Sequence, residues 1–564
     1  MVFTPPSWVP QLPIDPPDSI TVGEFMQREE FGRRPVSKSR NPFTCGLTGR
    51  TYKAPEFYQR AEFLARAYAK RLGWSPNEGT AWDKVIGVFA LNTIDYITLA
   101  YGAHRLSGIV TPPTPSTPPT SSATSFHRPR GGQGRGRPRG QRLHPRHPGF
   151  ELEAQYKGRF TTVEELIAEG RGLPELEPLR WSKGQGGRQP AFLCYSSGTS
   201  GLPKAVMISH RNIIANIIQH STYETVGRKS RGVDTQNVLC FLPFSHIYAL
   251  VVIAHTCTWR GDGIVVLPKF DFTHYLESIQ KYRVNQLIVV PPSSSACCRT
   301  RTCAASTTSA ACASSLAALP PGCRDHSGDP RHVPLLDHWP GLRHDRDRCR
   351  RHRSQRARHF PRASGSLLPG LRAKLIDPEG REITAHETPG ELLVQGPAVV
   401  LGYLNNEKAS AETFVHHDDG RWIRTGDEAL VAVSPQGNEQ IVIVDRIKEL
   451  IKVKGHQVAP AELEAHILAH PDVDDVAVIQ IPDLKSGEVP KAFVVKASHA
   501  TSRSDQELAA IITKHVEDHK AHYKWIKGGV EFLDAIPKSP SGKILRRLLR
   551  DQEKEARRKK GAKL

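Results

Sequence analysis

The feature that most constrains this chain is a polar loop between two short apolar runs. The runs AFLCY and VMI read as β-strands, so we expect the loop to be a strand-to-strand tip. Its hydroxyl-bearing and glycine residues are Ser196, Ser197, Gly198, Thr199, Ser200 and Gly201, and Lys204 follows them. Backbone N–H groups and hydroxyls in such a loop donate to phosphate oxygens, and a lysine adds positive charge. The sequence therefore predicts a polyphosphate cradle.

The spacing around Lys204 differs from that of a Walker loop. Lys204 follows Pro203 rather than a glycine, and Ala205 stands where Ser or Thr would bind Mg²⁺. This difference disfavours a P-loop NTPase. An ordinary polar turn is the alternative for SSGTSG taken alone.

Five further motifs follow this loop in order. They are FLPFSHIYAL (241–250), PGELLVQGPAVVLGYLNN (389–406), RWIRTGDEAL (421–430), IVDRIKELIKVKGHQVAPAELE (443–464) and KSPSGKILRR (538–547). With YSSGTSGLPK, they make the chain similar to the acyl-adenylate-forming superfamily. The resemblance is nearest to the 4-coumarate and phenylacetate CoA ligase branch and its fungal relatives, and it covers about residues 20–112, 150–292 and 366–550.

Strand and helix patterns alternate through residues 50–290 and predict α/β layering. RAEFLARAYAKRLG reads as a helix before the strand KVIGVFAL, and VLCFLPF and GIVVLP read as strands before the helix HYLESIQKY. The resemblance implies an adenylation domain over residues 1–445 and a small mobile α/β lid over 446–564, with the hinge near 445–448. In the lid, DDVAVIQIP and KAFVVKA read as strands, with helices starting at Pro460 and Asp505.

The resemblance implies a two-step reaction of a small carboxylic acid, with ATP, CoA and Mg²⁺. The acid, of the aryl, arylalkyl or medium-chain class, would form acyl-AMP and pyrophosphate, and CoA would then displace AMP. The motifs alone do not distinguish this ligase from a luciferase-like oxidase. The glutamate of a GYGMTE motif usually holds Mg²⁺ in this family, and the chain lacks that motif. We therefore assign no residue as a metal ligand.

Four residues receive catalytic roles from the resemblance. Lys543 would reach the carboxyl and phosphate oxygens of the adenylate, and His246 would close the acyl tunnel until CoA enters. Lys448 and Lys452 would face the acyl-adenylate in one lid orientation. The alternatives are a surface lysine for Lys543, a core histidine for His246 and a solvated basic strand-turn for KELIKVKG.

Further residues are implied to bind nucleotide, acyl group or CoA. Asp427 has two oxygens for the ribose hydroxyls, and Arg446 would hold ribose or phosphate, although it could simply pair with Asp445. Tyr248 would lie on the acyl side, and Lys269 near a CoA phosphate. In the second lid orientation, Lys454 and Gly455 would line the CoA path, while Gln457 contacts the nucleotide.

The net charge of +20 would ordinarily suggest a nucleic-acid partner. Most of it lies in two blocks without Lys or Glu: residues 114–149 hold seven Arg, and residues 293–365 hold thirteen Arg against five Asp. A basic binding face usually mixes Lys with Arg. We therefore predict no nucleic-acid partner.

Both blocks begin where the family resemblance is interrupted, directly after GIVTP and after LIVVPP. The second block is poor in apolar residues and holds six of the ten cysteines. Ordering a residue costs about 1–2 kcal/mol of backbone entropy, which such a composition cannot offset by burial. We interpret residues of about 113–149 and 293–365 as frame-shifted. DHWPGLRHDRD, residues 337–347, can be encoded by DNA that reads TIGQGYGMTE one nucleotide later. An inactive relic or mistranslated ligase remains the alternative, and disordered inserts a further one.

The termini bear on localisation. The N-terminus has no secretory pattern and no apolar run is long enough for a membrane span, which predicts an intracellular protein. Ala562, Lys563 and Leu564 form a close variant of the SKL tripeptide that peroxisomal import receptors read. We therefore expect import into peroxisomes, or otherwise a cytoplasmic enzyme with a solvated basic tail.

Overall fold

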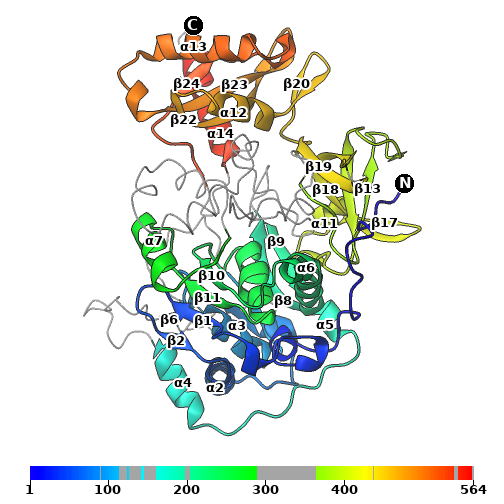
Figure 1. The fold of residues 1–564 in the computed structure, drawn as a ribbon, viewed down its shortest axis with the longest axis vertical. Helices are drawn as coiled ribbons and strands as arrows, with labels where there is room; N and C mark the ends of the chain where they lie inside the picture. The colour runs from blue at the N-terminus through cyan, green and yellow to red at the C-terminus, as the bar shows by residue number, and fades with distance from the viewer. Residues whose placement is uncertain are drawn as a thin grey trace, which may run out of the picture.

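A computed structural model gives the fold, and Figure 1 shows its parts. It describes residues 1–88, 90–112, 161–196, 204–288, 364–435, 437–538 and 544–561, together with the backbone of two short strands at 124–125 and 142–144. Two sheets with helices form the largest part. A third sheet lies beside them, and a lid lies at the end away from helices α2 and α4.

The first sheet has the strand order β16-β9-β8-β4-β3-β5-β6-β7. Its strands are β3 (Val85–Gly87), β4 (Ile109–Thr111), β5 (Thr124–Ser125), β6 (Arg142–His144), β7 (Thr161–Thr162), β8 (Pro190–Ser196), β9 (Lys204–Ser209) and β16 (Gly402–Tyr403). β8 and β9 pair antiparallel, with Ser196 opposite Lys204. The predicted strand-to-strand tip is therefore confirmed as the connection of a hairpin.

The second sheet has the order β12-β10-β11-β1-β2. Its strands are β1 (Phe43–Cys45), β2 (Thr51–Tyr52), β10 (Asn237–Cys240), β11 (Gly263–Val266) and β12 (Gln286–Leu287). β1, β10, β11 and β12 run parallel, and β11 is buried along its whole length. Continuous apolar strands of this kind are typical of a sheet covered on both faces.

Helices surround these two sheets, and all of them except α5 contribute residues to one apolar core shared with the sheets. They are α1 (Val22–Phe25), α2 (Ala54–Leu72), α3 (Tyr96–His104), α4 (Val163–Arg171), α5 (Gln185–Arg188), α6 (His210–Ser230), the π-helix η5 (Tyr248–Cys257) and α7 (Phe272–Lys281). α6 starts directly after β9, because Ser209 and Asn212 form a reciprocal capping box. The strand VMI thus passes straight into a buried helix.

The third sheet has the order β14-β13-β15-β18-β17, and β19 pairs with β18. Its elements are β13 (Arg372–Ile376), β14 (Glu382–Ile383), β15 (Gly390–Gln395), α11 (Glu407–Thr413), β17 (Phe414–His417), β18 (Gly420–Val433) and β19 (Glu439–Arg446). The fully buried Trp422 packs with Ile376 and Leu393 on one side of it. β19 ends at Arg446 and leads into the lid.

The lid sheet has the order β21-β20-β23-β22, and β24 pairs with β23. Its elements are β20 (Ile451–Val453), β21 (His456–Val458), α12 (Pro460–Leu468), β22 (Val473–Asp483), β23 (Gly487–Lys496), α13 (Asp505–Glu517), β24 (Val530–Phe532) and α14 (Arg546–Gly561). Val476 and Val478 contribute to the core shared with α12 and α13, while Ala477 and Ile479 join Leu549 of α14 in another. This alternation follows from the period of two in DDVAVIQIP.

The predicted α/β class is confirmed, and the elements predicted at α2, α7, α12, α13, β3, β10, β11, β22 and β23 are present. The domain boundary at 445/446 remains a prediction. The two suspect blocks lie almost wholly outside the described residues. Among the described helices, none combines the length and hydropathy needed to cross a bilayer.

Candidate active site

The β8–β9 hairpin fixes both ends of the predicted phosphate loop. Ser196 ends β8 and Lys204 begins β9, and both are half-buried. Ser197, Gly198, Thr199, Ser200 and Gly201 lie outside the described residues. The hairpin register brings the first and last residues of the loop opposite each other. Whatever path the loop takes, it starts and finishes at one edge of the first sheet.

A second motif packs against this hairpin. β16 pairs antiparallel with β9, with Tyr403 opposite Val206, and the Lys204 ammonium lies 4.9 Å from the centre of the Tyr403 ring. A cation at this distance from an aromatic ring is attracted by the ring's quadrupole. Tyr403 therefore helps to hold Lys204 at the end of the loop. Sequence reasoning had not singled out Tyr403, because strand pairing over some two hundred positions leaves no local pattern.

The turn that carries His246 is held by a buried asparagine. The Asn92 amide donates to the carbonyl of Leu242 at 2.6 Å and accepts from the N–H of Phe244 at 2.8 Å. His246 is half-buried rather than in the core, and its Nδ1 accepts a hydrogen bond from the N–H of Tyr248 at 3.3 Å. The core-histidine alternative is thus wrong for His246. Asn92 was also missed, since an isolated Asn has no recognisable spacing.

Asp427 and Arg446 meet across two strands of the third sheet. They are register partners on β18 and β19, and the Arg446 Nε lies 3.4 Å from the Asp427 Oδ1. The Asp427 residue is 2% exposed. The guanidinium of Arg446 faces Asp427, whereas its backbone N–H donates to Asp445 at 2.6 Å. The alternative in which Arg446 merely pairs its side chain with Asp445 is therefore wrong.

Asp445 connects this strand pair to the lid. Its second carboxylate oxygen accepts a hydrogen bond from the N–H of Ala461, at the N-terminus of α12, at 3.1 Å. An acid at a helix N-terminus satisfies an unpaired N–H and interacts favourably with the helix dipole. Burial, with a smaller effect from Asp445, raises the pKa of Glu428, its register partner. The hinge therefore concentrates negative charge beside the predicted ribose site.

A buried arginine pairs with two further acids near the hinge. Arg546, at the start of α14, donates to Glu449 at 2.7 Å and to both oxygens of Glu464 at 2.7 Å. All three side chains are buried. Burial raises the pKa of Glu464, and Arg546 opposes that rise. This network joins the hinge segment, α12 and the segment that follows Lys543.

Lys543 itself lies outside the described residues, but both sides of its loop are fixed. Lys538 and Ile544 form an antiparallel bridge, and the N–H of Leu545 donates to the carbonyl of Pro537 at 2.8 Å. The Ile544 side chain is buried in the lid core. The loop of residues 539–543 thus begins and ends at one point on the lid.

The lid residues predicted to contact substrates share one hairpin and the segment before it. Lys448, Lys452, Lys454, Gly455 and Gln457 are all exposed, and Lys452 is opposite Gln457 in the pairing of β20 with β21. Lys454 and Gly455 both have positive φ, at 48° and 83°. Two such residues match the type I′ turn that favours tight hairpins. The turn presents Lys454 at the tip.

Lys269 is exposed and follows β11 in the second sheet. Tyr248, half-buried, is the first residue of η5. The structure thus brings together Lys204 with Tyr403, His246 with Tyr248, and Asp427 with Arg446. The lid residues and Lys269 are each placed on exposed segments.

Comparisons with known proteins identify the family of the chain. A family model described as AMP-binding enzyme matches residues 152–326, and the AMP-binding enzyme C-terminal domain matches residues 462–543. The chain is 34% identical to acyl-CoA ligase easD of Emericella nidulans, over 98% of this chain and 100% of that protein. It is also 34% identical to acyl-CoA ligase cm3C of Cordyceps militaris, over 98% of this chain and 90% of that protein. The chain belongs to the AMP-binding enzymes.

Solved structures of this fold have the same overall arrangement. ATP-bound MatB from Rhodopseudomonas palustris is 20% identical, covers 95% of this chain and 99% of its own, and superposes with a TM-score of 0.69. The anthranilate CoA ligase AuaEII in complex with anthranoyl-AMP is 18% identical, covers 95% and 98%, and gives a TM-score of 0.66. As an AMP-binding enzyme, the chain therefore has the acyl-adenylate-forming fold, with its C-terminal domain.

Proposed function

We propose that this AMP-binding enzyme joins a carboxylic acid to CoA at the expense of ATP, through an acyl-AMP. The observation that carries the proposal is the pairing of buried Asp427 with Arg446 directly at the hinge of the lid. A buried carboxylate can accept hydrogen bonds from both ribose hydroxyls, and it lies beside the strand that leads to Lys448 and Lys452. The acyl-CoA ligases aligned over nearly the whole chain support the same activity.

In the first step, the 196–204 loop and Lys204 hold the phosphates of ATP, while Lys543 neutralises charge that develops at the α-phosphorus. The acid's carboxylate oxygen attacks that phosphorus, and pyrophosphate leaves. In the second step, the CoA thiol loses its proton to solvent and its sulfur attacks the acyl carbon. The bond between the acyl carbon and the AMP phosphate oxygen breaks, and AMP leaves with its electrons. Lys454 and Gly455 guide CoA, and Lys269 binds one of its phosphates. Mg²⁺ would accompany ATP, and none of the described residues is assigned to it.

The substrate class is an aryl, arylalkyl or medium-chain acid. We expect His246 and Tyr248 to border the acyl group. They lie just before and at the start of η5, whose residues from Ala249 to Cys257 are buried and apolar apart from His255 and Thr256. Apolar surroundings at the start of η5 would favour an uncharged acyl body over a second carboxylate. Substrate preference is then a question of shape.

Purified chain incubated with ATP, CoA and a panel of such acids tests this function. We expect AMP and acyl-CoA to form in equal amounts, and AMP formation to depend on the acid. A folded chain that forms neither product with any acid contradicts the proposal and favours the inactive relic. Products formed with oxygen consumption and light would indicate the luciferase-like oxidase.

Peroxisomal import is a separate part of the proposal. Ala562, Lys563 and Leu564 lie outside the described residues and directly follow α14, which ends at Gly561. An SKL-like tripeptide is read by an import receptor. A fluorescent protein fused ahead of α14 is expected to enter peroxisomes, and to stay cytoplasmic when Leu564 is removed. Equal distribution of the two fusions would contradict import.

A further inference from the structure

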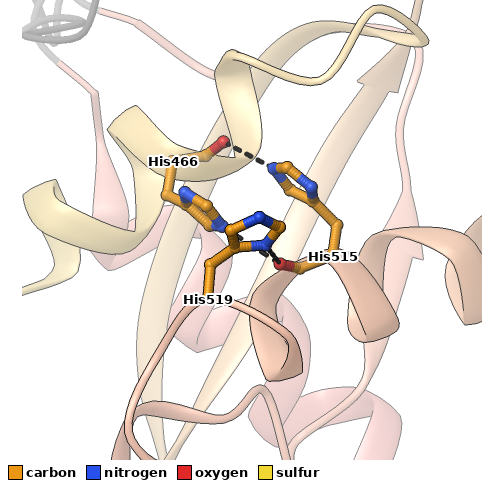
Figure 2. A group of neighbouring side chains, drawn as sticks. All are labelled: His466, His515 and His519. Atoms are coloured by element: carbon orange, nitrogen blue, oxygen red, sulfur yellow. Dashed lines mark hydrogen bonds between the residues drawn. The ribbon is translucent and has the colours of Figure 1, made fainter.

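Four histidines, none of them part of the motifs described above, gather where α12 and α13 of the lid face each other. His466 lies in the last turn of α12 and His470 lies just beyond its end, while His515 lies in the last turn of α13 and His519 lies just beyond its end. The His466 and His515 rings stack with their centres 4.3 Å apart, and the centre of the His519 ring lies 5.3 Å from that of His466. Figure 2 shows three of these rings in the space between the two helices.

His466, His515 and His519 each offer a ring nitrogen, and these three nitrogens lie within 4.8 Å of one another. Zn²⁺ binds imidazole nitrogen at about 2.0–2.1 Å, so two ligand nitrogens of a tetrahedral ion lie roughly 3.4 Å apart. Small rotations of the three rings close that difference. His519 is exposed and the other two are half-buried, so an ion can reach the rings from solvent.

Backbone carbonyls now orient these rings. His466 Nε2 donates to the carbonyl of His515 at 3.1 Å, and His515 Nε2 donates to the carbonyl of His466 at 3.3 Å (Figure 2). His519 Nδ1 donates to the carbonyl of His515 at 2.9 Å. Each such bond contributes only about 0.5–1.5 kcal/mol net. Coordination by three imidazoles can therefore replace them.

A metal ion requires neutral imidazole, so the charge of Lys520, the residue after His519, bears on the site. The charge of Lys520 is partly balanced by its ion pair with Glu462 at 2.9 Å. His470 is set apart, because its Nδ1 accepts the N–H of Asp472 at 3.2 Å, so a neutral ring carries its proton on Nε2.

We propose that His466, His515 and His519 form a site for a divalent transition-metal ion, with Zn²⁺ as its occupant, that bridges α12 and α13. Three imidazoles match the ligand preference of Zn²⁺, Ni²⁺ and Cu²⁺ over Mg²⁺ and Ca²⁺. The fourth position is open to water. The bound ion exchanges three weak hydrogen bonds for coordinate bonds. It would so tie α12, whose N-terminus donates a hydrogen bond to Asp445, to α13.

The test is Zn²⁺ binding to the untagged, chelator-treated full chain, measured by calorimetry and by competition with a chromophoric chelator. The variants are His519→Gln and His515→Gln, and the matched control is His522→Gln, an exposed lid histidine outside the cluster. Because six cysteines in residues 293–365 could also bind Zn²⁺, the quantity compared is the difference between the variants and the control.

We expect the unaltered chain and His522→Gln to bind one more ion than His519→Gln, or to bind it at least about tenfold more tightly. Cu²⁺ in place of Zn²⁺ should give an electron paramagnetic resonance spectrum of nitrogen ligands, which the His519 variant loses. Equal Zn²⁺ binding by all four proteins, or a Cu²⁺ spectrum unaffected by His519→Gln, would overturn the proposal. His519 is exposed, so its variant reports even if His515→Gln proves unstable.

Discussion

Individual residues beside the predicted hinge hold structural contacts and also carry the binding roles proposed above. Asp427 is buried beside Arg446, and the next acid along the strand, Glu428, is opposite Asp445. The pairing register of β18 with β19 therefore fixes the position of each acid. Substitutions there should separate nucleotide binding from stability.

Asp427→Asn keeps the shape of the side chain but removes its charge. Charge-assisted hydrogen bonds contribute about 1.5–3 kcal/mol, so we expect the KM for ATP to rise by roughly 10- to 100-fold. Acid-dependent AMP formation at varied ATP measures it. Glu439→Gln is the control. Glu439 lies on β19, like Arg446, and its carboxylate pairs with the exposed His386. Similar KM values for the two variants would contradict a ribose contact.

Arg546→Met leaves Glu449 and Glu464 buried without their cation. Removing one partner of a buried ion pair typically costs about 3–5 kcal/mol, so the free energy of unfolding of the lid should fall by that order. Urea denaturation followed by lid fluorescence measures the loss. Arg547→Met is the matched control, because Arg547 is exposed and its ion pair with Asp551 is long, at 3.8 Å. If both variants unfold at the same urea concentration, the buried network does not stabilise the lid.

At the scale of elements, local patterns predicted part of the site and not the rest. The β8–β9 hairpin was predictable because short apolar runs flank a glycine-rich loop. The π-helix η5 was not, since YALVVIAHTC is apolar apart from His255 and Thr256 and shows no helical period. The Arg546 network joins residues 82 and 97 positions apart, and such pairs leave no signal in local spacing.

The β20–β21 turn yields an element-scale prediction. Lys454 has positive φ, a conformation that Asn adopts more readily than Lys. Lys454→Asn should therefore keep or slightly raise lid stability while it weakens CoA binding, with the KM for CoA raised by about three- to tenfold. Thermal unfolding and initial rates at varied CoA measure the two effects. An unchanged KM for CoA would place the CoA path elsewhere.

At the scale of the whole molecule, the described parts depend on buried neutral histidines. Burial lowers the pKa of His104 to about 3 and that of His255 to about 4, and it holds the pKa of His210 well below its usual range. The His104 and His210 rings lie 4.6 Å apart, so neither tolerates a charge on the other. The folded protein binds fewer protons than the unfolded chain.

Stability should consequently fall as the pH drops below about 6.5, the usual pKa of an unfolded histidine. The stabilisation is fully present above that pH and is lost progressively toward the depressed pKa values of the folded state. Urea denaturation at pH 7.5 and at pH 5.5, at constant ionic strength, measures the change in free energy of unfolding. A free energy of unfolding that is the same at both pH values would show that these buried histidine rings do not stay neutral in the folded protein.

The two arginine-rich blocks belong to the same scale. If residues 113–149 and 293–365 are frame-shifted, the transcript should contain a reading frame that encodes the TIGQGYGMTE segment. A chain with that segment restored should form AMP at least about a hundredfold faster, since the motif supplies the Mg²⁺ ligand in the family. Sequencing the transcript tests this directly. A transcript with no such reading in any frame ends the hypothesis.

The short connection between β19 and β20 has one last consequence. Only four residues separate Arg446 from Ile451, and Glu449 and Leu450 both donate backbone hydrogen bonds to the carbonyl of Arg446. A tether of about 14–18 Å at full extension keeps the lid at an effective concentration in the millimolar range. The lid can therefore bind weakly to the substrate-loaded large domain and leave it quickly. It stays tethered and does not have to find the large domain again by diffusion.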